Sequence, residues 1–346
     1  MNQFRRSPRP HWQNGLTLIE LLVALGLGLV VVVMGLAALT IGQQGYRAVD
    51  SAAELRDRER LATDLLSRVI IQAGYQDFGA GIVSLRSAAA LSSTTDPEPD
   101  IYAWNNAVYA VPSDLILSSS GNIANENRPA SCGTVNDTSC KNGSDIVVIR
   151  YQGVNLPTNA SKADNTMINC AGQGERGLTT NDLNERAVSM FHVTRGINGE
   201  PALSCSYYSF AATTPGWVSS PIIEGVESFQ VLYGTDGVAP GAAPSTAATA
   251  QDSVADRWLR ADQLTVAGNA VATRENWRRV RSVRVGLVLR GAAGSAQQAV
   301  ASTFTPLGPL FVSTADTGSS LAVAADGRLR LQSAFTVHLR NDLTLR

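Results

Sequence analysis

Residues 15–20 read Gly-Leu-Thr-Leu-Ile-Glu, and the 22 residues from Leu21 to Gly42 that follow contain no charged side chain. As a helix this run would be about 33 Å long, which is enough to cross a hydrocarbon core of roughly 30 Å. Glu20 then lies at the start of a predicted membrane-spanning helix. An ionised side chain within such a helix costs about 2.5–3.5 kcal/mol on insertion scales, so Glu20 is expected to have a partner.

A short basic leader precedes this segment. Residues 1–14 contain Arg5, Arg6 and Arg9 and no acidic residue. Positive charge before a membrane helix keeps that side in the cytoplasm, so the rest of the chain is expected outside it. Three interpretations are open: a secretory signal peptide, a plain signal anchor, and a leader removed before the apolar run. The run exceeds the usual signal-peptide length of about 7–15 residues, and a plain anchor leaves Glu20 unexplained.

The hexapeptide resembles the signature of prepilins, in which a glycine precedes an apolar residue and a glutamate stands at the fifth mature position. The resemblance implies cleavage by a prepilin peptidase between Gly15 and Leu16, followed by N-methylation of Leu16. The leucine departs from the phenylalanine that is usual there. The resemblance also implies that Glu20 pairs with the N-terminal amine of a neighbouring subunit during docking, which lowers the cost of burying its charge. The alternative is that Glu20 reaches the membrane interface near the helix start.

The helical pattern continues beyond the apolar run. Apolar residues recur at the spacing of one helical stripe: Tyr46, Val49, Ala53, Ala62, Leu66, Val69 and Ala73. The other face is dense in charge and includes acid-before-base pairs such as Glu54–Arg58. The pattern predicts one helix from about Leu16 to Ala73, ended by Gly74, whose stripe packs on a globular domain.

These features predict four parts of the chain. They are a leader at 1–15, a transmembrane or filament-core half-helix at 16–43, an amphipathic half-helix at 44–73, and an extracytoplasmic domain at 74–346. Polar, Gly-rich and Pro-rich composition predicts surface loops at 92–100 and 234–256. Variable loops are expected near 92–128 and 234–256.

The remaining pattern of the domain is that of β-strands. Short apolar or alternating runs occur at 145–151, 188–194, 205–210, 227–233, 283–290 and 335–339. In the run at 283–290, one face is expected to be buried and the other partly charged. Strands joined by loops after one long helix predict an α+β fold, in which the helix packs on a mostly antiparallel sheet.

The charge balance argues against a dedicated nucleic-acid surface. The formal net charge is −1, and removal of the three leader arginines takes it to −4. Duplex binding requires a basic stripe, and only the arginines within 277–284 form a basic cluster. Nucleic acid is therefore not expected as a partner, and DNA binding through that cluster is a minor option.

Four cysteines follow the apolar segment: Cys132, Cys140, Cys170 and Cys205. They lie in a compartment expected to oxidise thiols, and they allow three pairings. The preferred pairing joins Cys132 to Cys140 and Cys170 to Cys205. Metal binding is the alternative, but there is no CxxC motif and no histidine lies near a cysteine in sequence. No metal and no cofactor are expected.

The acidic and histidine residues of the domain do not form a catalytic pattern. Asp96, Glu98 and Asp100 are predicted to form a solvated acidic loop, with calcium binding as the alternative, although the EF-hand spacing is missing. His192 and His338 are predicted to face solvent from strands. Patterns of the GxSxG, Walker and HExxH types are absent, so an enzyme is not expected.

Three stretches of the second half resemble the PilW family of minor pilins. They are IEGVESFQVLYG at 223–234, the strand after Trp277 at 280–290, and the C-terminal segment at 328–341. The resemblance implies a minor pilin that helps to prime and assemble the type IV pilus in a tip or initiation complex, supporting adhesion and twitching motility.

That resemblance also implies partners and a location. The partners would be a prepilin peptidase, other minor pilins, the major pilin, the inner-membrane assembly platform and, before assembly, inner-membrane lipid. The protein would cross the inner membrane once with a periplasmic domain and later reach the pilus at the cell surface. Alternatives are a GspJ-type pseudopilin of a type II secretion system and a tip-exposed module that binds a surface or DNA.

Overall fold

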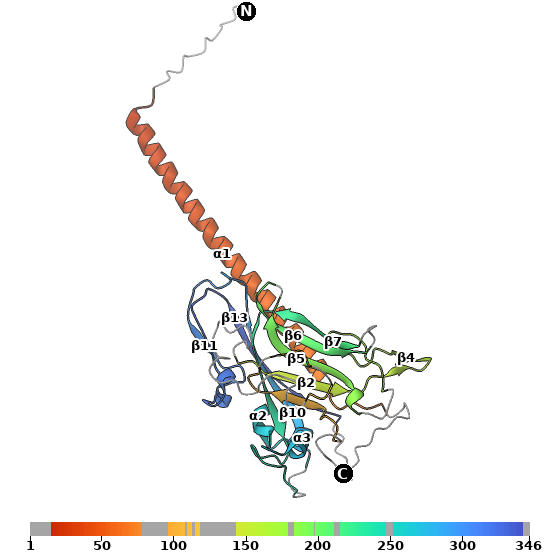
Figure 1. Ribbon diagram of the computed structural model, residues 1–346. Helices are drawn as coiled ribbons and strands as arrows, with labels where there is room; N and C mark the ends of the chain where they lie inside the picture. The colour runs from red at the N-terminus through yellow and green to blue at the C-terminus, as the bar shows by residue number, and fades with distance from the viewer. Residues whose placement is uncertain are drawn as a thin grey trace, which may run out of the picture. The chain divides into compact units, whose positions relative to one another are not determined.

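The computed structural model describes residues 15–77, 96–107, 109–112, 115–117, 143–178, 183–196, 198–210, 215–246 and 252–341. The chain divides into two compact units, Met1–Asp50 and Ser51–Arg346. Helix α1 (Leu18–Ile70) contributes to both units, and every strand belongs to the second (Figure 1).

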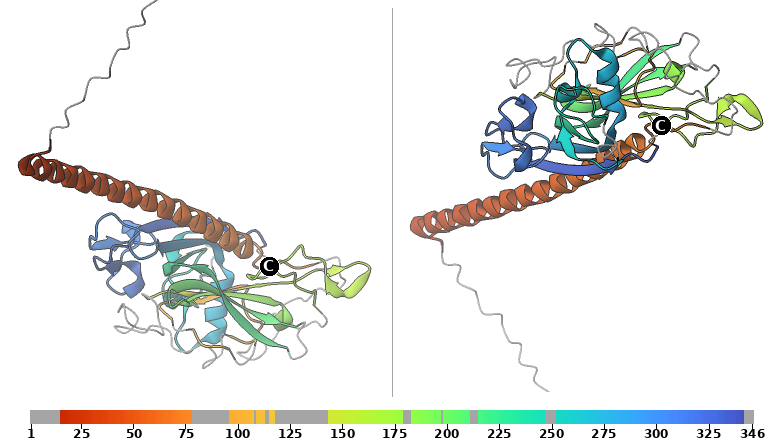
Figure 2. Two further views of the ribbon diagram at one scale, coloured as in Figure 1. Left: turned by 90° about the horizontal axis from the view of Figure 1, so that it is seen from above. Right: turned by 90° about the horizontal axis from the view of Figure 1, so that it is seen from below.

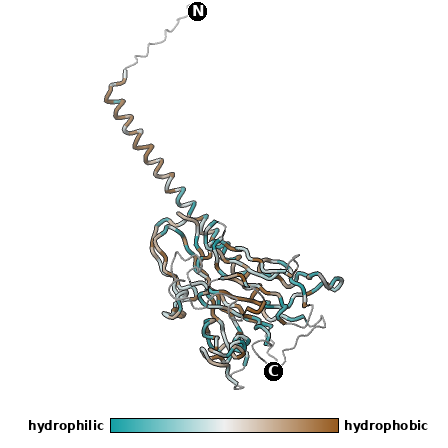
Figure 3. Tube along the Cα trace, viewed as in Figure 1, coloured by the Kyte–Doolittle hydropathy of each residue, from teal (hydrophilic) through white to brown (hydrophobic). Residues whose placement is uncertain are grey.

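Helix α1 has 53 residues, about 80 Å of helix. Thr17 precedes its first residue, and Gly74 ends the turn that follows Ile70. The φ angle of Gly74 is +72°, in the left-handed region that glycine adopts without steric cost. The helix therefore ends three residues before the predicted Ala73, and Gly74 closes the turn that follows it. Among the described residues, α1 is long and apolar enough to cross a membrane, and its apolar run is visible in Figure 3.

Within the second unit, α1 buries one stripe. The buried side chains are Leu55, Ala62, Leu66, Val69 and Ile70. The prediction is confirmed for the stripe from Ala62 onward. It was wrong for Ala53, which is exposed, while Tyr46 and Val49 belong to the first unit. Periodicity identifies a possible buried face, but it does not say where along a helix the packing partner begins.

The first sheet has five antiparallel strands in the order β1-β2-β5-β6-β7. Their bounds are β1 Ile101–Trp104, β2 Ile146–Tyr151, β5 Ala187–Arg195, β6 Pro201–Ser209 and β7 Gly216–Glu224. In the register of the sheet, Phe191 lies opposite both Val147 and Cys205. Strand β1 lies within 92–128, where the sequence indicated only a variable loop.

The second sheet has four antiparallel strands in the order β13-β10-β8-β9. Their bounds are β8 Val226–Thr235, β9 Arg257–Leu259, β10 Val280–Arg290 and β13 Arg330–His338. Val283 lies opposite Tyr233 on one side and Val337 on the other. Strand β13 lies along the part of α1 in the second unit (Figure 2), where Ser333 Oγ donates to Glu59 Oε1 at 2.6 Å.

The remaining elements are short. Two-stranded sheets are formed by β3 (Asn155–Leu156) with β4 (Asn159–Ala163), and by β11 (Ser302–Phe304) with β12 (Leu321–Val323). The helices are α2 (Ala261–Leu264) and α3 (Ala270–Arg278), with 3-10 turns at Leu183–Glu185, Pro309–Phe311 and Thr317–Ser319. The predicted α+β fold, a long N-terminal helix with mostly antiparallel sheet, is confirmed.

One hydrophobic core connects α1, both large sheets and α3. It includes Leu66, Phe191, Tyr233, Trp277 and Val285. The second face of β10 is also covered, because Val288 packs against Leu321, Val323 and Phe304 of the chain between β10 and β13. Arg284 and Arg290 make this face partly charged, as expected, but the segment that covers it was not predicted. A covering segment so far along the chain is not visible in the alternation of the strand itself.

Candidate functional site

The start of α1 holds the Glu20 carboxylate in a defined place. Glu20 Oε2 accepts hydrogen bonds from the backbone N–H of Thr17, at 3.0 Å, and from Thr17 Oγ1, at 2.9 Å. Thr17 Oγ1 in turn accepts from the Glu20 N–H at 3.4 Å. Reciprocal bonds of this kind form a capping box, which satisfies two donors that would otherwise lack partners at a helix N-terminus.

The capping box keeps Glu20 next to the beginning of the predicted mature chain. Both hydrogen bonds that the carboxylate accepts reach Oε2 and come from Thr17, which follows Leu16. Gly15 has no atoms near the position that a Cβ would occupy, and Leu16 and Glu20 are exposed. Among the described residues, the carboxylate therefore lies exposed at the start of α1. The leader residues 1–14 lie outside the described residues.

Cys170 and Cys205 form a disulfide, with Cα atoms 5.7 Å apart. This half of the preferred pairing is confirmed. Cys205 belongs to β6, and Cys170 belongs to the irregular segment 164–178. Cys132 and Cys140 lie outside the described residues, so their pairing stays a prediction.

The segment that carries Cys170 is also held to the end of α1. Gln72 Nε2 donates to the Ile168 carbonyl at 3.0 Å, and the Ile168 N–H donates to Gln72 Oε1 at 2.9 Å. The Tyr151 hydroxyl donates to the same carbonyl at 2.8 Å. The disulfide and these bonds connect the helix end, β2 and β6 through a single loop.

The prediction of a solvated loop at Asp96, Glu98 and Asp100 was wrong. Asp96 and Glu98 are buried. Asp96 Oδ1 lies 2.9 Å from Arg278 Nη2, and Glu98 Oε1 lies 3.3 Å from Arg274 Nη2. Ion pairs therefore hold the loop at 96–100 against the rest of the domain, and the loop is not an acidic surface patch.

Two further arginines complete this cluster. Glu98 Oε2 lies 3.7 Å from Arg150 Nη2 on β2, and Asp100 pairs with Arg186. The arginine partners follow the acids by 52 to 182 positions in sequence, so local spacing could not reveal them. Within the described part of the chain, no three carboxylate, cysteine or histidine side chains come together as metal ligands.

Helix α3 supplies two of these arginines and was not predicted. A signal for it exists, because Asn269 is a favourable N-cap residue. Its Oδ1 accepts from the Ala272 N–H at 2.9 Å. Three of the four arginines in the basic cluster at 277–284 are engaged internally: Arg278 with Asp96, Arg281 with Asp236 and Arg284 with the Leu307 carbonyl. These contacts weaken the observation on which the DNA option depended.

His192 was predicted to face solvent, and this was wrong. It is fully buried between β2 and β6, where its Nε2 lies 2.8 Å from Ser206 Oγ and its ring stacks on Tyr109 at 3.6 Å between centroids. Its Nδ1 has no hydrogen-bond partner among the described residues. Tyr109 covers the His192 ring on this face of the sheet, which alternation within β5 does not indicate. His338 is exposed, as predicted.

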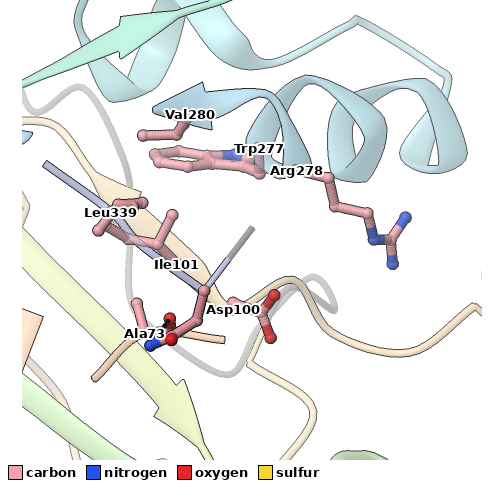
Figure 4. Close-up of a pocket in the computed structure, with 8 residues that line it drawn as sticks. Ala73, Asp100, Ile101, Trp277, Arg278, Val280 and Leu339 are labelled. Carbon is pink, nitrogen blue, oxygen red and sulfur yellow. Dashed lines mark hydrogen bonds between the residues drawn. The ribbon is translucent and has the colours of Figure 1, made fainter. Parts of the chain in front are cut away.

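A cavity of about 20 Å³ lies beside the end of α1. Figure 4 shows Ile101 and Leu339 next to each other below the Trp277 ring, with the Arg278 side chain extending away from it. A cavity of this size holds about one water molecule. It is a packing gap, too small for an organic ligand.

Comparison with known proteins agrees with the stretches singled out above. The family model of Type IV pilus-assembly protein W matches residues 190–341. A solved structure that is similar is the type IV-like pilin from Thermus thermophilus, at 15% identity and a TM-score of 0.37, covering 83% of this chain and 96% of that one. No curated protein matches. All three stretches lie within the matched residues, which confirms the resemblance, and over residues 190–341 the chain is similar to the family of Type IV pilus-assembly protein W.

Proposed function

We propose that this protein is a minor pilin that enters a type IV pilus initiation complex through its N-terminal helix. The observation that carries the proposal is the conjunction of the Gly15–Glu20 hexapeptide with the family match at 190–341. The role is structural: the globular domain is held above the membrane while α1 joins other subunits. The domain is periplasmic before assembly and surface-exposed afterwards.

In this proposal, the Thr17–Glu20 capping box holds the Glu20 carboxylate in place before the subunit docks. After cleavage at Gly15, Leu16 carries a free amine one residue before Thr17. Within lipid, the two Thr17 donors lower the cost of the Glu20 charge until a second subunit brings an amine. Pairing between an amine and a carboxylate then stabilises one axial position of α1 relative to its neighbour, as buried polar groups do in coiled coils.

The processing step is tested by intact-mass measurement of the full chain from its membrane. The expected mature species begins at Leu16, with one added methyl group on its amine. The Gly15→Leu variant should remain as the precursor, because a bulky side chain replaces the residue before the scissile bond. A mature chain that begins elsewhere would overturn this part of the proposal.

The docking step is tested with Glu20→Ala and Glu20→Gln. Both variants should be cleaved normally, since Glu20 lies beyond the scissile bond, and both should co-purify poorly with other pilins. Glu20→Gln keeps the acceptor for Thr17, so a loss in both variants assigns the effect to charge rather than to capping. Asp57→Asn, at an exposed position of α1, is the control and should behave as wild type. Undiminished co-purification of Glu20→Gln contradicts the pairing role.

A further inference from the structure

The chain between β10 and β13 covers the outer face of the second sheet and is nearly free of charge. Residues 291–325, here called the outer cover, contain one charged residue, Asp316. Charged residues make up 16% of the whole chain, so a segment of 35 residues with that composition would contain five or six charged residues. Asp316 is itself buried, so the exposed surface of the outer cover carries no charge.

Most exposed side chains of the outer cover are small or apolar, and the larger polar ones are Gln297 and Gln298. Eight are alanines, at positions 292, 293, 299, 301, 315, 322, 324 and 325. Among the larger side chains, Leu310 has an exposed fraction of 92%, Val300 of 62% and Val312 of 48%. Single exposed apolar residues are common on soluble proteins, but an uncharged surface that also carries large apolar side chains is typical of a contact site.

The outer cover is held rigidly on β10. A Cβ at Gly286 would lie 2.5 Å from the Pro306 carbonyl oxygen, so only glycine lets the loop before Leu310 approach the strand this closely. Arg284 Nε donates to the Leu307 carbonyl at 3.2 Å, and its guanidinium carbon lies 5.2 Å from the centre of the Phe311 ring. Leu310 therefore projects from a loop that is fixed on both sides.

A second set of bonds holds the far end of the outer cover to the first sheet. Asn106, which follows β1, donates from Nδ2 to Asp316 Oδ1 at 2.9 Å. The Gly318 N–H donates to Asn106 Oδ1 at 3.2 Å. The buried charge of Asp316 thus serves internal attachment, and the exposed face is left to Ala, Gly, Ser, Thr, Gln and apolar side chains.

We propose that the outer cover is the surface through which the globular domain contacts an adjacent pilin subunit of a different chain. The inference rests on the proposed function and names the partner of the domain rather than of the helix. The centres of protein interfaces are depleted of charge, and a rigid surface rich in alanine loses little conformational entropy on binding.

The chemistry of the outer cover sets the chemistry of its partner. An opposing charged surface would lose hydration without gaining an ion pair, so the partner surface is uncharged as well. A closed pair of this chain through the same face would leave that face unavailable for growth, whereas a filament is built from heterologous contacts. We therefore assign the face to another pilin chain, since a second copy that offered its own outer cover would form such a closed pair.

The test places a photoreactive phenylalanine analogue at position 310 of the full chain, expressed in its own cells with the other pilins. A matched probe at position 254 is the control, since Val254 is also exposed but lies outside the outer cover. The expected result is an adduct at 310, identified by mass spectrometry as a different chain with a prepilin-type N-terminus. Its yield should exceed that at 254 by about tenfold, the ratio for a contact favoured by 1.4 kcal/mol.

A third probe at Leu36 of α1 separates this inference from the proposed function. If the probe at 36 gives pilin adducts but the probe at 310 gives none, the inference is overturned and the proposed function stands. The same holds if the probe at 36 gives pilin adducts and the yields at 310 and 254 are equal. No pilin adduct at either site overturns both. An adduct at 310 only with a second copy of this chain, with lipid, or with a protein that is not a pilin also overturns the inference.

A charge variant gives an independent readout. Leu310→Glu places a carboxylate on the outer cover at a side chain that makes little contact with its own domain, so folding should be unchanged. The yield of the wild-type adduct measured from a probe at 312 should fall about tenfold in Leu310→Glu and stay unchanged in Val254→Glu. An unchanged yield in Leu310→Glu contradicts the inference.

Discussion

At the scale of single residues, two buried ionisable groups make the stability of the domain depend on pH in opposite senses. Burial lowers the pKa of the His192 imidazole to about 3. Burial raises the pKa of the Glu175 carboxyl to about 7, although Asn169 donates a hydrogen bond to it and Arg176 lies nearby. The corresponding ordinary values are 6.5 and 4.5.

The signs of the two effects follow from proton linkage. Between pH 6.5 and 3, the unfolded chain binds a proton at His192 that the folded chain does not, so acidification lowers the free energy of unfolding. Between pH 7 and 4.5, the folded chain holds a proton at Glu175 that the unfolded chain lacks, so acidification raises the free energy of unfolding. In the shared window the two effects oppose each other in the wild-type protein.

We predict that single variants separate these effects. Relative to wild type, His192→Gln should gain up to about 1.4 kcal/mol of unfolding free energy per pH unit as pH falls from 6.5. Glu175→Gln should lose up to about the same amount per unit as pH falls from 7 to 4.5. Urea unfolding of the full chain in detergent micelles, at several pH values, measures both. Parallel pH profiles for all three proteins would contradict the assignment.

The buried ion pairs of the loop at 96–100 predict a second residue-level effect on the free energy of unfolding. Glu98→Gln should lower the free energy of unfolding by about 3 kcal/mol or more, because two buried guanidinium groups lose the carboxylate that balances them. Asp57→Asn breaks an exposed pair with Arg60, 3.9 Å long, and should cost less than about 1 kcal/mol. Urea unfolding of the two variants under the same conditions checks the difference. Equal losses of unfolding free energy in the two variants would show that burial does not determine how much the Glu98 ion pairs contribute to stability.

Whether a residue's role could be predicted depended on how far away its partners lie in sequence. Glu20 and its hexapeptide were recognisable because the relevant spacing is only a few residues. Glu98 and His192 were misassigned because Arg274 and Tyr109 reach them across 176 and 83 positions. Local patterns record which side of a strand or helix a residue occupies, whereas burial of that side is decided by distant segments.

At the scale of elements, α1 and the long strands other than β7 were predicted from periodicity, while the outer cover was not. Phe229, Val231 and Tyr233 alternate as a half-buried strand does, and the structure buries all three. The outer cover has only three-residue strands and no apolar period of its own. It is ordered by contacts with β10, above all at Gly286, so its structure depends on the sheet beneath it.

We therefore predict that Gly286→Ala destabilises the domain through the outer cover. The added methyl group would meet the Pro306 carbonyl and the Leu307 N–H, both of them backbone atoms that cannot rotate aside. Overpacking of this kind costs about 1–3 kcal/mol. Urea unfolding measures the cost, and hydrogen exchange should show faster exchange at 302–323.

The matched control is Gly216→Ala on β7. No atom lies within 4 Å of the position that a Cβ would occupy there, and the φ angle is not positive. This variant should be as stable as wild type, with unchanged exchange in the outer cover. If both variants behave alike, close approach at Gly286 is not what holds the outer cover.

At the scale of the whole molecule, the second unit begins within α1 rather than after it, because Ser51–Ile70 belongs to the domain. These residues bury five side chains in the core, and Asn341 Nδ2 caps the end of α1 by donating to the Ile71 carbonyl at 3.1 Å. Full burial of a large apolar side chain is worth about 1.5–3 kcal/mol, so the buried stripe contributes roughly 10 kcal/mol. This is comparable with the entire stability of a typical domain, about 5–15 kcal/mol.

We predict that a fragment of residues 51–346 folds alone and that a fragment of residues 74–346 does not. The first keeps the buried stripe of α1, whereas the second opens the core where Leu66 and Ile70 pack and leaves Asn341 without the helix it caps. Urea unfolding, monitored by near-ultraviolet circular dichroism, should show a cooperative transition for the longer fragment and none for the shorter one. Both fragments lack the apolar run, so a difference between them cannot be assigned to membrane insertion. A cooperative transition of equal midpoint in the shorter fragment would show that the strands fold without α1, and that the helix is only an anchor.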